Sequence, residues 1–473
     1  MVSAFYSHVT YQDRKYYDSL LKYGANSRSP TVELELIGNR VIFTADRENL
    51  RAILATQFND FGKGEGFRAD WHGILGDSVF SLDGANWHSA RQLLRPQFMK
   101  DRISDLIIFE KYSEILLRGF AGGEVGITSP EEGLRGVGKV VNVTSFIHRF
   151  TLDTSTDFLF GKSVGSLGDA NNAFGEAFEE AERALSTRTR AGPAKMFLST
   201  KKLDHAIQTI NNIAFPYIDA ALSLDASQLA SKSTDQSYTF LHALASVSRD
   251  RIFLRDQIVS ILLAGRDTTA AILVWILYEL AQHPEIYAKL RTDVLSTVGA
   301  TATPTYTDLK DMKYLQATIN ETLRAYPLPY NMRVALKDTT LPRGGGPDGS
   351  LPVGIPTGTP VSFSTFNLHH NPDIYPSSSE DPNFPPMEQF DPDRWLRWHP
   401  KPWTYIPFSG GPRICLGQQF ALAEMGYTLV KICQRFTRMS FAEDEKGIQR
   451  VKADIMIEPV DDLKMKFWTD NKG

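Results

Sequence analysis

The most constraining feature of this sequence is a glycine-rich segment around one of its two cysteines. Residues 408–417 read Phe-Ser-Gly-Gly-Pro-Arg-Ile-Cys-Leu-Gly, and a strong helical pattern begins at the last glycine. Cys415 thus precedes a helix N-terminus, where free N–H groups and the helix dipole favour a thiolate, and Arg413 adds a nearby cation. A thiolate held in this way suits axial ligation of heme iron. The alternative, an inert buried cysteine, fits an isolated Cys-x-Gly better than this whole segment.

The glycines of this segment are predicted to make room for such a ligand. Gly410 and Gly411 let the backbone turn sharply and approach a flat ligand closely. Gly417 removes a side chain at a point where a macrocycle could lie. The segment is therefore expected to carry a flat, iron-containing group against its cysteine.

Composition excludes several other classes of protein. Of 473 residues, 51 are Lys or Arg and 55 are Asp or Glu, and the net charge of −4 argues against a nucleic-acid binder. Two cysteines, Cys415 and Cys433, exclude a disulfide framework and a cysteine-rich metal site, and they favour a reducing compartment. No window reaches the ~18 consecutive apolar residues of a membrane span, and residues 1–17 lack the apolar core of a secretory signal. The chain as written is expected to be soluble or at most peripheral to a membrane.

Hydrophobic periodicity and turn residues predict a mainly helical protein with small β-regions. No shift in composition marks a domain boundary, so a single domain over residues 1–473 is expected. The predicted elements, in chain order, are a helix at 11–24, a hairpin at 32–45, a helix capped by Asp46 that ends near Phe58, a loop at 59–85, a helical body at about 86–325, a small β-region at about 326–370, an irregular stretch at 371–412 and a helix from Gly417 to about Phe436.

The segment 408–417 resembles the heme-binding loop of the cytochrome P450 monooxygenases. The resemblance covers nearly the whole chain, because three further motifs of that family occur in the family's order. It implies the cytochrome P450 fold, mainly α with small β-sheets (α+β). In that fold a triangular helical body holds heme between a long central helix and the helix after the cysteine loop. Phe408, Gly410, Arg413, Cys415 and Gly417 are then cofactor-binding residues, and Cys415 is the axial ligand of the iron.

The first further motif lies on a long helical run from Arg251 to His283. Residues 264–269 read Ala-Gly-Arg-Asp-Thr-Thr, and the Thr268 hydroxyl can bond the carbonyl of Ala264 four residues back. The resemblance implies that Ala264 lies beside the heme, and that Thr268 and Asp267 are catalytic residues that relay protons to bound oxygen. The alternative is an ordinary buried helix with a solvent-facing aspartate.

The second motif is a Glu-x-x-Arg pair, Glu321 and Arg324, followed by Pro392-Asp-Arg394. Pairs at i,i+3 share one helix face and are usually surface decoration of little consequence. The resemblance implies instead that Glu321, Arg324 and Arg394 form one buried network that fixes the loop carrying the cysteine.

The third motif is Trp87-x-x-x-Arg91, whose spacing points both side chains at one ligand. The resemblance implies that Trp87 and Arg91 reach a heme propionate, and that Arg333 does the same. The two remaining features that attract attention have plainer interpretations. His369 and His370 precede Asn-Pro and are expected to end a structural element, and Cys433 is expected to be a small core or surface residue.

Several stretches resemble one fungal group within the family, the n-alkane and fatty-acid ω-hydroxylases. Members of that group normally begin with a membrane-spanning helix and a proline-rich hinge, and the sequence as given shows neither, so a truncated sequence or gene model and an unanchored member all stay open. The stretch after Arg324 is also one residue shorter than the usual form. Substrate contacts are expected from 70–85, 185–215, 258–268 and 326–335. The stretches that carry the resemblance are 42–46, 53–58, 60–64, 75–77, 94–98, 151–154, 158–161 and, most distinctively, 340–349.

The resemblance implies a heme-thiolate monooxygenase that uses heme b, O2 and electrons from NADPH. The electrons come through a separate NADPH–cytochrome P450 reductase, since no flavin domain fits in this length. The reductase is expected to dock near Arg91, Arg95, Lys100 and Lys431, on the cytosolic face of the endoplasmic reticulum. The expected reaction is hydroxylation of an unactivated C–H bond, such as the end of a fatty acid or alkane. Oxidation of a polyketide-type fungal metabolite, an O2-independent isomerase or dehydratase, and a non-catalytic binder stay open.

Overall fold

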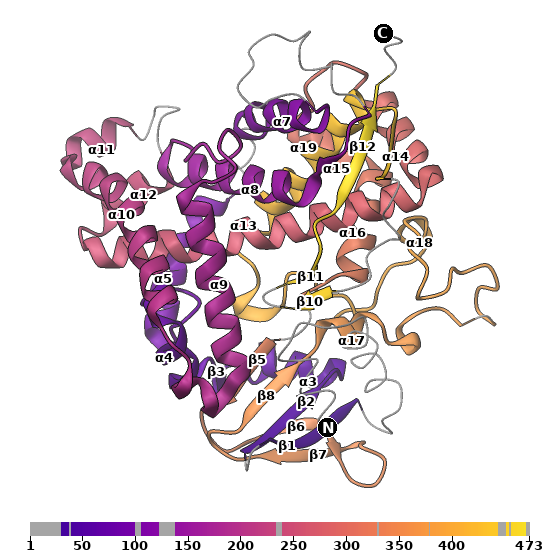
Figure 1. Ribbon diagram of the computed structural model, residues 1–473. Helices are drawn as coiled ribbons and strands as arrows, with labels where there is room; N and C mark the ends of the chain where they lie inside the picture. The colour runs from indigo at the N-terminus through magenta and orange to yellow at the C-terminus, as the bar shows by residue number, and fades with distance from the viewer. Residues whose placement is uncertain are drawn as a thin grey trace.

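The computed structural model describes residues 30–36, 39–99, 106–122, 138–232, 239–328, 331–377, 379–442, 451–453 and 456–469. The helix predicted at 11–24 lies outside these residues. The structure is mainly helical, with one five-stranded sheet and several smaller ones, which confirms the predicted fold class. Figure 1 shows the long helix α13 (Arg251–Gln282) crossing the middle of the molecule and the five-stranded sheet at the end opposite α7 (Ile107–Phe120).

The five-stranded sheet begins with the predicted hairpin. Strands β1 (Thr31–Leu36) and β2 (Asn39–Thr44) pair antiparallel, with Thr31 opposite Thr44. The sheet continues through β8 (Pro360–Phe363), β5 (Asn331–Ala335) and β3 (Phe61–Gly62), so two segments far apart in the chain, 31–62 and 331–363, form it together. This places the segment after helix α16 (Lys313–Ala325), which carries Arg333, in the same sheet as the start of the described chain.

Asp46 caps a helix, as predicted. Its carboxylate accepts hydrogen bonds from the backbone N–H groups of Glu48 and Asn49 at the start of α3 (Arg47–Arg51). The predicted helix then continues as a π-helical turn, Ala52–Thr56, and a 3-10 turn, Phe58–Asp60. A side chain with an acceptor oxygen satisfies N–H groups that a helix cannot pair internally, which explains why the helix begins there.

The prediction of a loop at 59–85 is wrong, because these residues include helix α4 (Gly64–Leu75). The helix has apolar residues at 67, 71, 74 and 75, and Ile74 and Leu75 are buried. Of the glycines that suggested a loop, Gly66 and Gly73 lie inside the helix, and Gly64 and Gly76 mark its ends. Gly64 and Gly76 both have a positive φ, which glycine adopts without strain.

The helical body lies where the sequence predicts it, from 84 to 325. Its central member, α13, has 32 residues, begins at an Asp250 cap and is buried nearly all round, as expected of a core helix. Among the described residues α13 is the one helix long and apolar enough to cross a membrane, but 78% of its most apolar window is buried inside the protein. The helices are α5 (Gly84–Leu94), α7 (Ile107–Phe120), α8 (Val143–Phe160), α9 (Ala173–Ala191), α10 (Lys201–Ser223), α11 (Ala226–Lys232), α12 (Phe240–Val247), α13 (Arg251–Gln282), α14 (Pro284–Thr297), α15 (Tyr306–Asp311) and α16 (Lys313–Ala325).

The chain after residue 325 forms strands, turns and one long helix. The β-region contains the hairpin β6 (Thr339–Gly345) and β7 (Leu351–Ile355), then the short helices α17 (Thr365–His369) and α18 (Arg394–Arg397). The predicted last helix is α19 (Gln418–Arg435), in which Cys433 is fully buried. Strands that the sequence did not indicate complete the chain: β9 (Arg438–Phe441) and β12 (Lys464–Trp468) with β4 (Val141–Asn142), and β10 (Val451–Ala453) with β11 (Ile457–Pro459).

Candidate functional site

Cys415 lies at the end of a closed loop, directly before α19. Its backbone N–H donates to the carbonyl of Phe408 at 3.0 Å, which closes the loop. Burial raises the pKa of the Cys415 thiol, while the backbone N–H groups of Gly417 and Gln418 and the charge of Arg91 act against it. The N–H groups at the start of α19 and a nearby cation thus favour the thiolate, as predicted, but burial of the sulfur opposes them. A metal ion bound to the sulfur would outweigh burial, because coordination deprotonates a thiol outright.

The cysteine is exposed, although the protein surrounds it closely enough to raise its pKa. A similar exposure interrupts α13 at Ala264, Gly265 and Thr268, which are only partly buried, while residues 262, 263, 266, 267, 269 and 270 around them are buried. The Thr268 hydroxyl donates to the Ala264 carbonyl at 2.6 Å, the bond that the sequence suggests. The cysteine loop and this face of α13 thus both leave surface that protein atoms do not cover, as a bound group would require.

A cluster of cations lies beside the cysteine loop. Arg413 donates to the carbonyl of Leu82 and to Asp83, and its guanidinium lies 4.5 Å from the centre of the buried Trp87 ring. Burial and the charge of Arg413 lower the pKa of Arg333 to about 10, and burial also lowers the pKa of Arg413 to about 10. Burial and the charges of Arg333 and Arg413 lower the pKa of Lys63 well below its usual value. Asp83 is one carboxylate among three cations, so the cluster holds unbalanced positive charge.

This excess of charge is a test of whether heme fits the site. Buried cations without an anion are costly, so such a cluster is stable when a ligand supplies negative charge. The only hydrogen bond that the Arg333 side chain makes within the described part of the chain is to the carbonyl of Met332. Arg91 donates to the carbonyl of Ile414, one residue before the cysteine, at 2.9 Å. A flat ligand that carries carboxylates, such as the two propionates of heme, would neutralise the cluster, and the residues present fit that group.

The glycines of the loop serve packing within the protein. A Cβ atom on Gly411 would lie 1.8 Å from the carbonyl oxygen of Leu54, and one on Gly410 would lie 2.6 Å from the ring of Trp403. Gly411 also has a positive φ, so the predicted sharp turn is present, and the close approach of this backbone to a flat ligand stays a prediction. Gly417 differs, because a Cβ there would meet Phe98 only at 3.9 Å.

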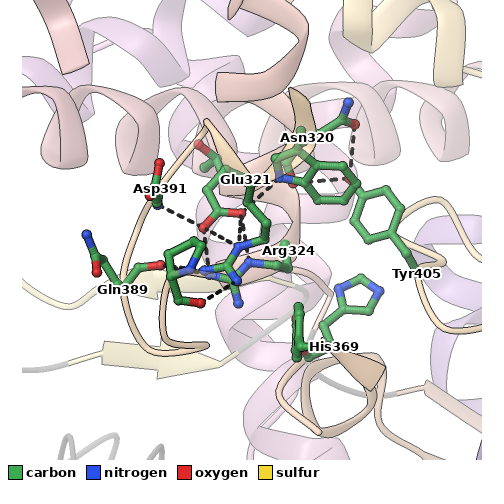
Figure 2. Close-up of polar contacts among 12 residues, drawn as sticks. Asn320, Glu321, Arg324, His369, Gln389, Asp391 and Tyr405 are labelled. Carbon is green, nitrogen blue, oxygen red and sulfur yellow. Dashed lines mark hydrogen bonds and ion pairs between the residues drawn. The ribbon is translucent and has the colours of Figure 1, made fainter. Parts of the chain in front are cut away.

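Glu321 is fully buried and accepts hydrogen bonds from four partners (Figure 2). Arg324 binds both carboxylate oxygens at 2.8 Å, and Arg394 approaches at 3.4 Å. The indole N–H of Trp395 and the backbone N–H of Asp391 complete the set. Burial opposes the charge of Arg324, but Glu321 outweighs it and raises the pKa of the guanidinium. The structure therefore brings the three predicted charges together in one buried network.

The network reaches the cysteine loop through residues that sequence reasoning missed. Figure 2 shows Tyr405 turned toward Asn320, the neighbour of Glu321, and the Tyr405 hydroxyl bonds the Asn320 side chain at 3.0 Å. The backbone N–H of Ile406 donates to Nε2 of His369 at 2.9 Å, and α17 ends at His369 as predicted. Both contacts join residues far apart in the chain, so no local sequence pattern predicts them. They fix the chain just before the loop 408–417.

Asp267 is buried and paired, so the alternative of a solvent-facing aspartate is excluded. Arg266 donates to its Oδ1 at 2.9 Å and also pairs with Glu179 of α9. Burial would raise the pKa of Asp267, but the charge of Arg266 and the proximity of His148 outweigh it, and the pKa is lowered. Asp267 thus stands ionised beside Thr268.

A further buried carboxyl, Glu424 of α19, was not noticed in the sequence. It accepts a hydrogen bond from Thr154 of α8, and burial raises its pKa to about 8 against hydrogen bonds from Thr154 and Thr269. The only signal for it is one charged residue on the apolar face of a helix pattern. Glu424 is therefore protonated at neutral pH in the folded protein.

The raised pKa of Glu424 predicts a pH-dependent stability. Between pH 4.5 and 8 the unfolded chain ionises this carboxyl while the folded chain keeps it protonated, so its contribution is fully present below 4.5 and lost as pH rises to about 8. The loss amounts to up to about 5 kcal/mol. When the pH rises from 5 to 8, the unfolding midpoint of Glu424→Gln should fall less than that of the wild type. The control is Glu285→Gln, whose side chain is 72% exposed. Equal pH dependence in wild type and Glu424→Gln would contradict the assignment.

The predicted reductase-facing cations are not all available. Lys431 is 8% exposed and pairs with Glu110 and Glu114 of α7. The prediction that it belongs to a docking surface is therefore wrong. Arg95 is exposed, and Lys100 lies outside the described residues. The spacing of charges along the sequence could not reveal that α7 covers this face of α19.

Comparisons with known proteins agree with this geometry. The sequence model of the family described as Cytochrome P450 matches residues 2–461. Cytochrome P450 monooxygenase pvhE of Talaromyces variabilis is 47% identical over 94% of this chain and 83% of its own length. Cytochrome P450 52A4 of Candida maltosa is 36% identical over 94% and 82%. Cytochrome P450 monooxygenase alt2 of Alternaria solani is 37% identical over 85% and 76%.

Solved structures show the same fold. The crystal structure of the cytochrome P450DA heme domain superposes with a TM-score of 0.80, covering 98% of this chain and 96% of that one. At 22% identity this likeness concerns the fold alone.

Proposed function

The chain belongs to the cytochrome P450 family of monooxygenases, and from this premise we propose that it hydroxylates an unactivated C–H bond of an apolar alkyl substrate, at the end of a fatty acid or alkane. The observation that carries the proposal is the exposed Cys415 beside a cluster of unbalanced cations. The choice of substrate rests on the stretches that resemble the n-alkane and fatty-acid ω-hydroxylases, the most distinctive of which is 340–349. Substrate contacts are proposed from 70–85, 185–215, 258–268 and 326–335.

We propose that heme b is held by Cys415 on one side and by the cation cluster at its carboxylates. Arg413, Arg333 and Lys63 would neutralise the propionates, with Trp87 and Arg91 alongside. When bound, the group would allow O2 to oxidise the substrate. The two electrons that this needs would come from NADPH through a separate reductase. Localisation at the cytosolic face of the endoplasmic reticulum and a single domain over 1–473 belong to the same proposal.

The chain's own residues then bind, orient and supply protons. Ala264 keeps the middle of α13 narrow, because any larger side chain would fill the partly exposed surface there. The Thr268 hydroxyl, held by the Ala264 carbonyl, can accept a proton from one side while it donates on the other. Asp267 next to it is ionised and can take up and release a proton. The network of Glu321, Arg324 and Arg394 holds the chain that precedes the cysteine.

Replacement of Thr268 by alanine is expected to lower the product formed per NADPH by about tenfold or more, because the hydroxyl that passes protons is lost. Thr268→Ser should keep most of the yield. A matched control is Thr292→Ala on α14, since Thr292 makes the same hydroxyl-to-carbonyl bond to Ala288 on an exposed helix face. Product and NADPH are measured in parallel, and an unchanged ratio in Thr268→Ala would remove Thr268 from the proton path.

Titration with saturated fatty acids of 12 to 18 carbons tests the substrate class. Entry of such an acid is expected to displace water from the iron and shift the absorption spectrum, and turnover is expected to yield the ω-hydroxy acid. Binding without ω-hydroxylation would mean that the enzyme oxidises another carbon of the acid. No response to any of these acids would remove fatty acids from the proposal.

A second candidate is oxidation of a fungal secondary metabolite with an alkyl tail. Two observations favour it. The 47% identical relative does not carry the name cytochrome P450 52 that the 36% identical relative carries. The stretch after Arg324, which leads into β5, is also one residue shorter than in the ω-hydroxylase group. A red-shifted carbon-monoxide spectrum with no fatty-acid response would support this candidate.

A further inference from the structure

The segment that leads into the cysteine loop is rich in tryptophan. Three of the seven tryptophans of the chain lie between residues 395 and 403. The Trp403 ring lies against Gly410 of the loop, where a Cβ atom would come within 2.6 Å of it. Tyr405 follows, and Figure 2 shows its ring next to Asn320 and the Glu321 network. Indole and phenol rings can give up single electrons, so this segment places oxidisable side chains beside the proposed heme.

Four of these rings form a continuous line of contacts from the loop toward the surface. The centroids of Tyr405 and Trp395 are 4.6 Å apart, and those of Trp395 and Trp398 are 5.7 Å apart. The line continues to Tyr375, whose centroid is 5.0 Å from that of Trp398. Aromatic rings interact at centroid distances of about 4.5–7 Å, so each ring is in contact with the next. Trp398 is only partly buried, and its two chain neighbours are exposed. The line therefore joins the chain before the cysteine loop to solvent.

The charges beside the rings differ along the line. The indole N–H of Trp395 donates to Oε2 of Glu321 at 2.9 Å, so a carboxylate faces the ring nitrogen. Negative charge at this place stabilises an indole that has lost an electron. The two arginines of the Glu321 network have their guanidinium carbons 5.3 and 5.9 Å from the centre of the Tyr375 ring, and cations there oppose its oxidation. Trp395 and Trp398 are thus the rings best placed to carry a positive charge, and Trp398 is the outer of the two.

From this arrangement we propose that Trp398 is a surface oxidation site, at which bulky phenols give electrons to the heme site through Trp395. The inference rests on the proposed function, because it needs the heme held by Cys415, and it adds a second substrate class and a second oxidant, hydrogen peroxide. An electron passes inward from Trp398 by way of Trp395. A phenol restores the electron at Trp398 and releases its O–H proton to water. Two phenols supply the two electrons and two protons that break the O–O bond of one hydrogen peroxide, and the products are two waters and two phenoxyl radicals.

A phenol tethered to a polymer tests the site, because the polymer keeps it out of the substrate site. Holoenzyme is mixed with hydrogen peroxide and either free guaiacol or guaiacol carried on polyethylene glycol. Trp398→Phe is expected to lose most of the oxidation of the tethered phenol. The variant should keep most of the oxidation of the free phenol, which can also approach the heme through the substrate site. Its NADPH-driven O2 consumption with the reductase should equal that of the wild type.

Trp468→Phe is the matched control. Trp468 of β12 is also partly buried, and it packs on Arg438, whose guanidinium carbon lies 3.9 Å from the ring centre. It belongs to another sheet and not to the line of rings, so the variant should oxidise both phenols like the wild type.

The positions of oxidative damage give a readout that does not depend on activity. After treatment with peroxide and no phenol, mass spectrometry should find oxygen added to the indoles of Trp395 and Trp398 in the wild type. In Trp398→Phe the added oxygen should increase at Trp395, because the positive charge can no longer leave that ring. Tethered phenol should suppress the damage in the wild type and not in Trp398→Phe.

The outcomes separate the inference from the function on which it rests. If the wild type shows the red-shifted carbon-monoxide spectrum and Trp398→Phe oxidises the tethered phenol as fast as Trp468→Phe, the inference is wrong and the proposed function stands. If Trp398→Phe loses the oxidation of both phenols and the NADPH-driven reaction to the same extent, Trp398 supports the structure of the heme site, and the inference is also wrong. If the wild type lacks the red-shifted spectrum, the proposed function fails and the inference fails with it.

Discussion

Substitution of Cys415 by serine is expected to abolish NADPH-dependent oxygenation and the red-shifted carbon-monoxide spectrum. A hydroxyl at this position cannot supply the thiolate that favours O–O bond cleavage. The loop should survive, because its closing hydrogen bond comes from the backbone N–H of residue 415 to the carbonyl of Phe408. Activity and the reduced carbon-monoxide spectrum are therefore measured on protein whose unfolding midpoint matches the wild type.

Cys433→Ser is the matched control. Cys433 is fully buried in α19, and burial raises the pKa of its thiol to about 12. The substitution costs some stability but should keep both spectrum and activity. Residual oxygenation in Cys415→Ser at the level of Cys433→Ser would show that Cys415 is not the ligand.

Replacement of Glu321 by alanine is expected to destabilise the protein by about 3–5 kcal/mol or more. The loss leaves the buried guanidinium groups of Arg324 and Arg394 without their shared carboxylate, and it leaves the Trp395 indole N–H unpaired. Because this network holds the chain before the cysteine loop, the purified variant should also contain less heme per protein.

Asp219→Asn is the control for Glu321→Ala. Asp219 of α10 forms a close ion pair with Arg251, but the side chain is 51% exposed. Exposed pairs are screened by water, so the unfolding midpoint should stay near that of the wild type. Similar changes of the unfolding midpoint in the two variants would mean that burial does not decide how much the Glu321 network stabilises the protein.

Local sequence patterns predicted the elements that depend on local chemistry. The unbroken helical run from Arg251 to His283 predicted α13, and the Asp46 cap predicted the start of α3. The pattern failed at α4, where three glycines outweighed a helical apolar spacing, and after residue 436, where strands pair with distant partners. In such strands the stabilising contacts are made across the fold, so the segment itself carries little signal.

The candidate site divides in the same way. Motif residues such as Cys415, Thr268 and Glu321 could be chosen from the sequence because each stands in a short pattern. Lys63 and Glu424 could not, because what distinguishes them is burial among groups from other elements. The misplaced Lys431 has the same cause, since only the fold reveals the two α7 glutamates that pair with it.

The reduced, carbon-monoxide-bound absorption spectrum of the purified wild-type protein tests the central claim most directly. The exposed Cys415 thiol and the unbalanced cations beside it predict a heme with thiolate ligation, and so a strongly red-shifted Soret band. Folded, heme-loaded protein without that band would contradict the assignment of Cys415 and the proposed function built on it.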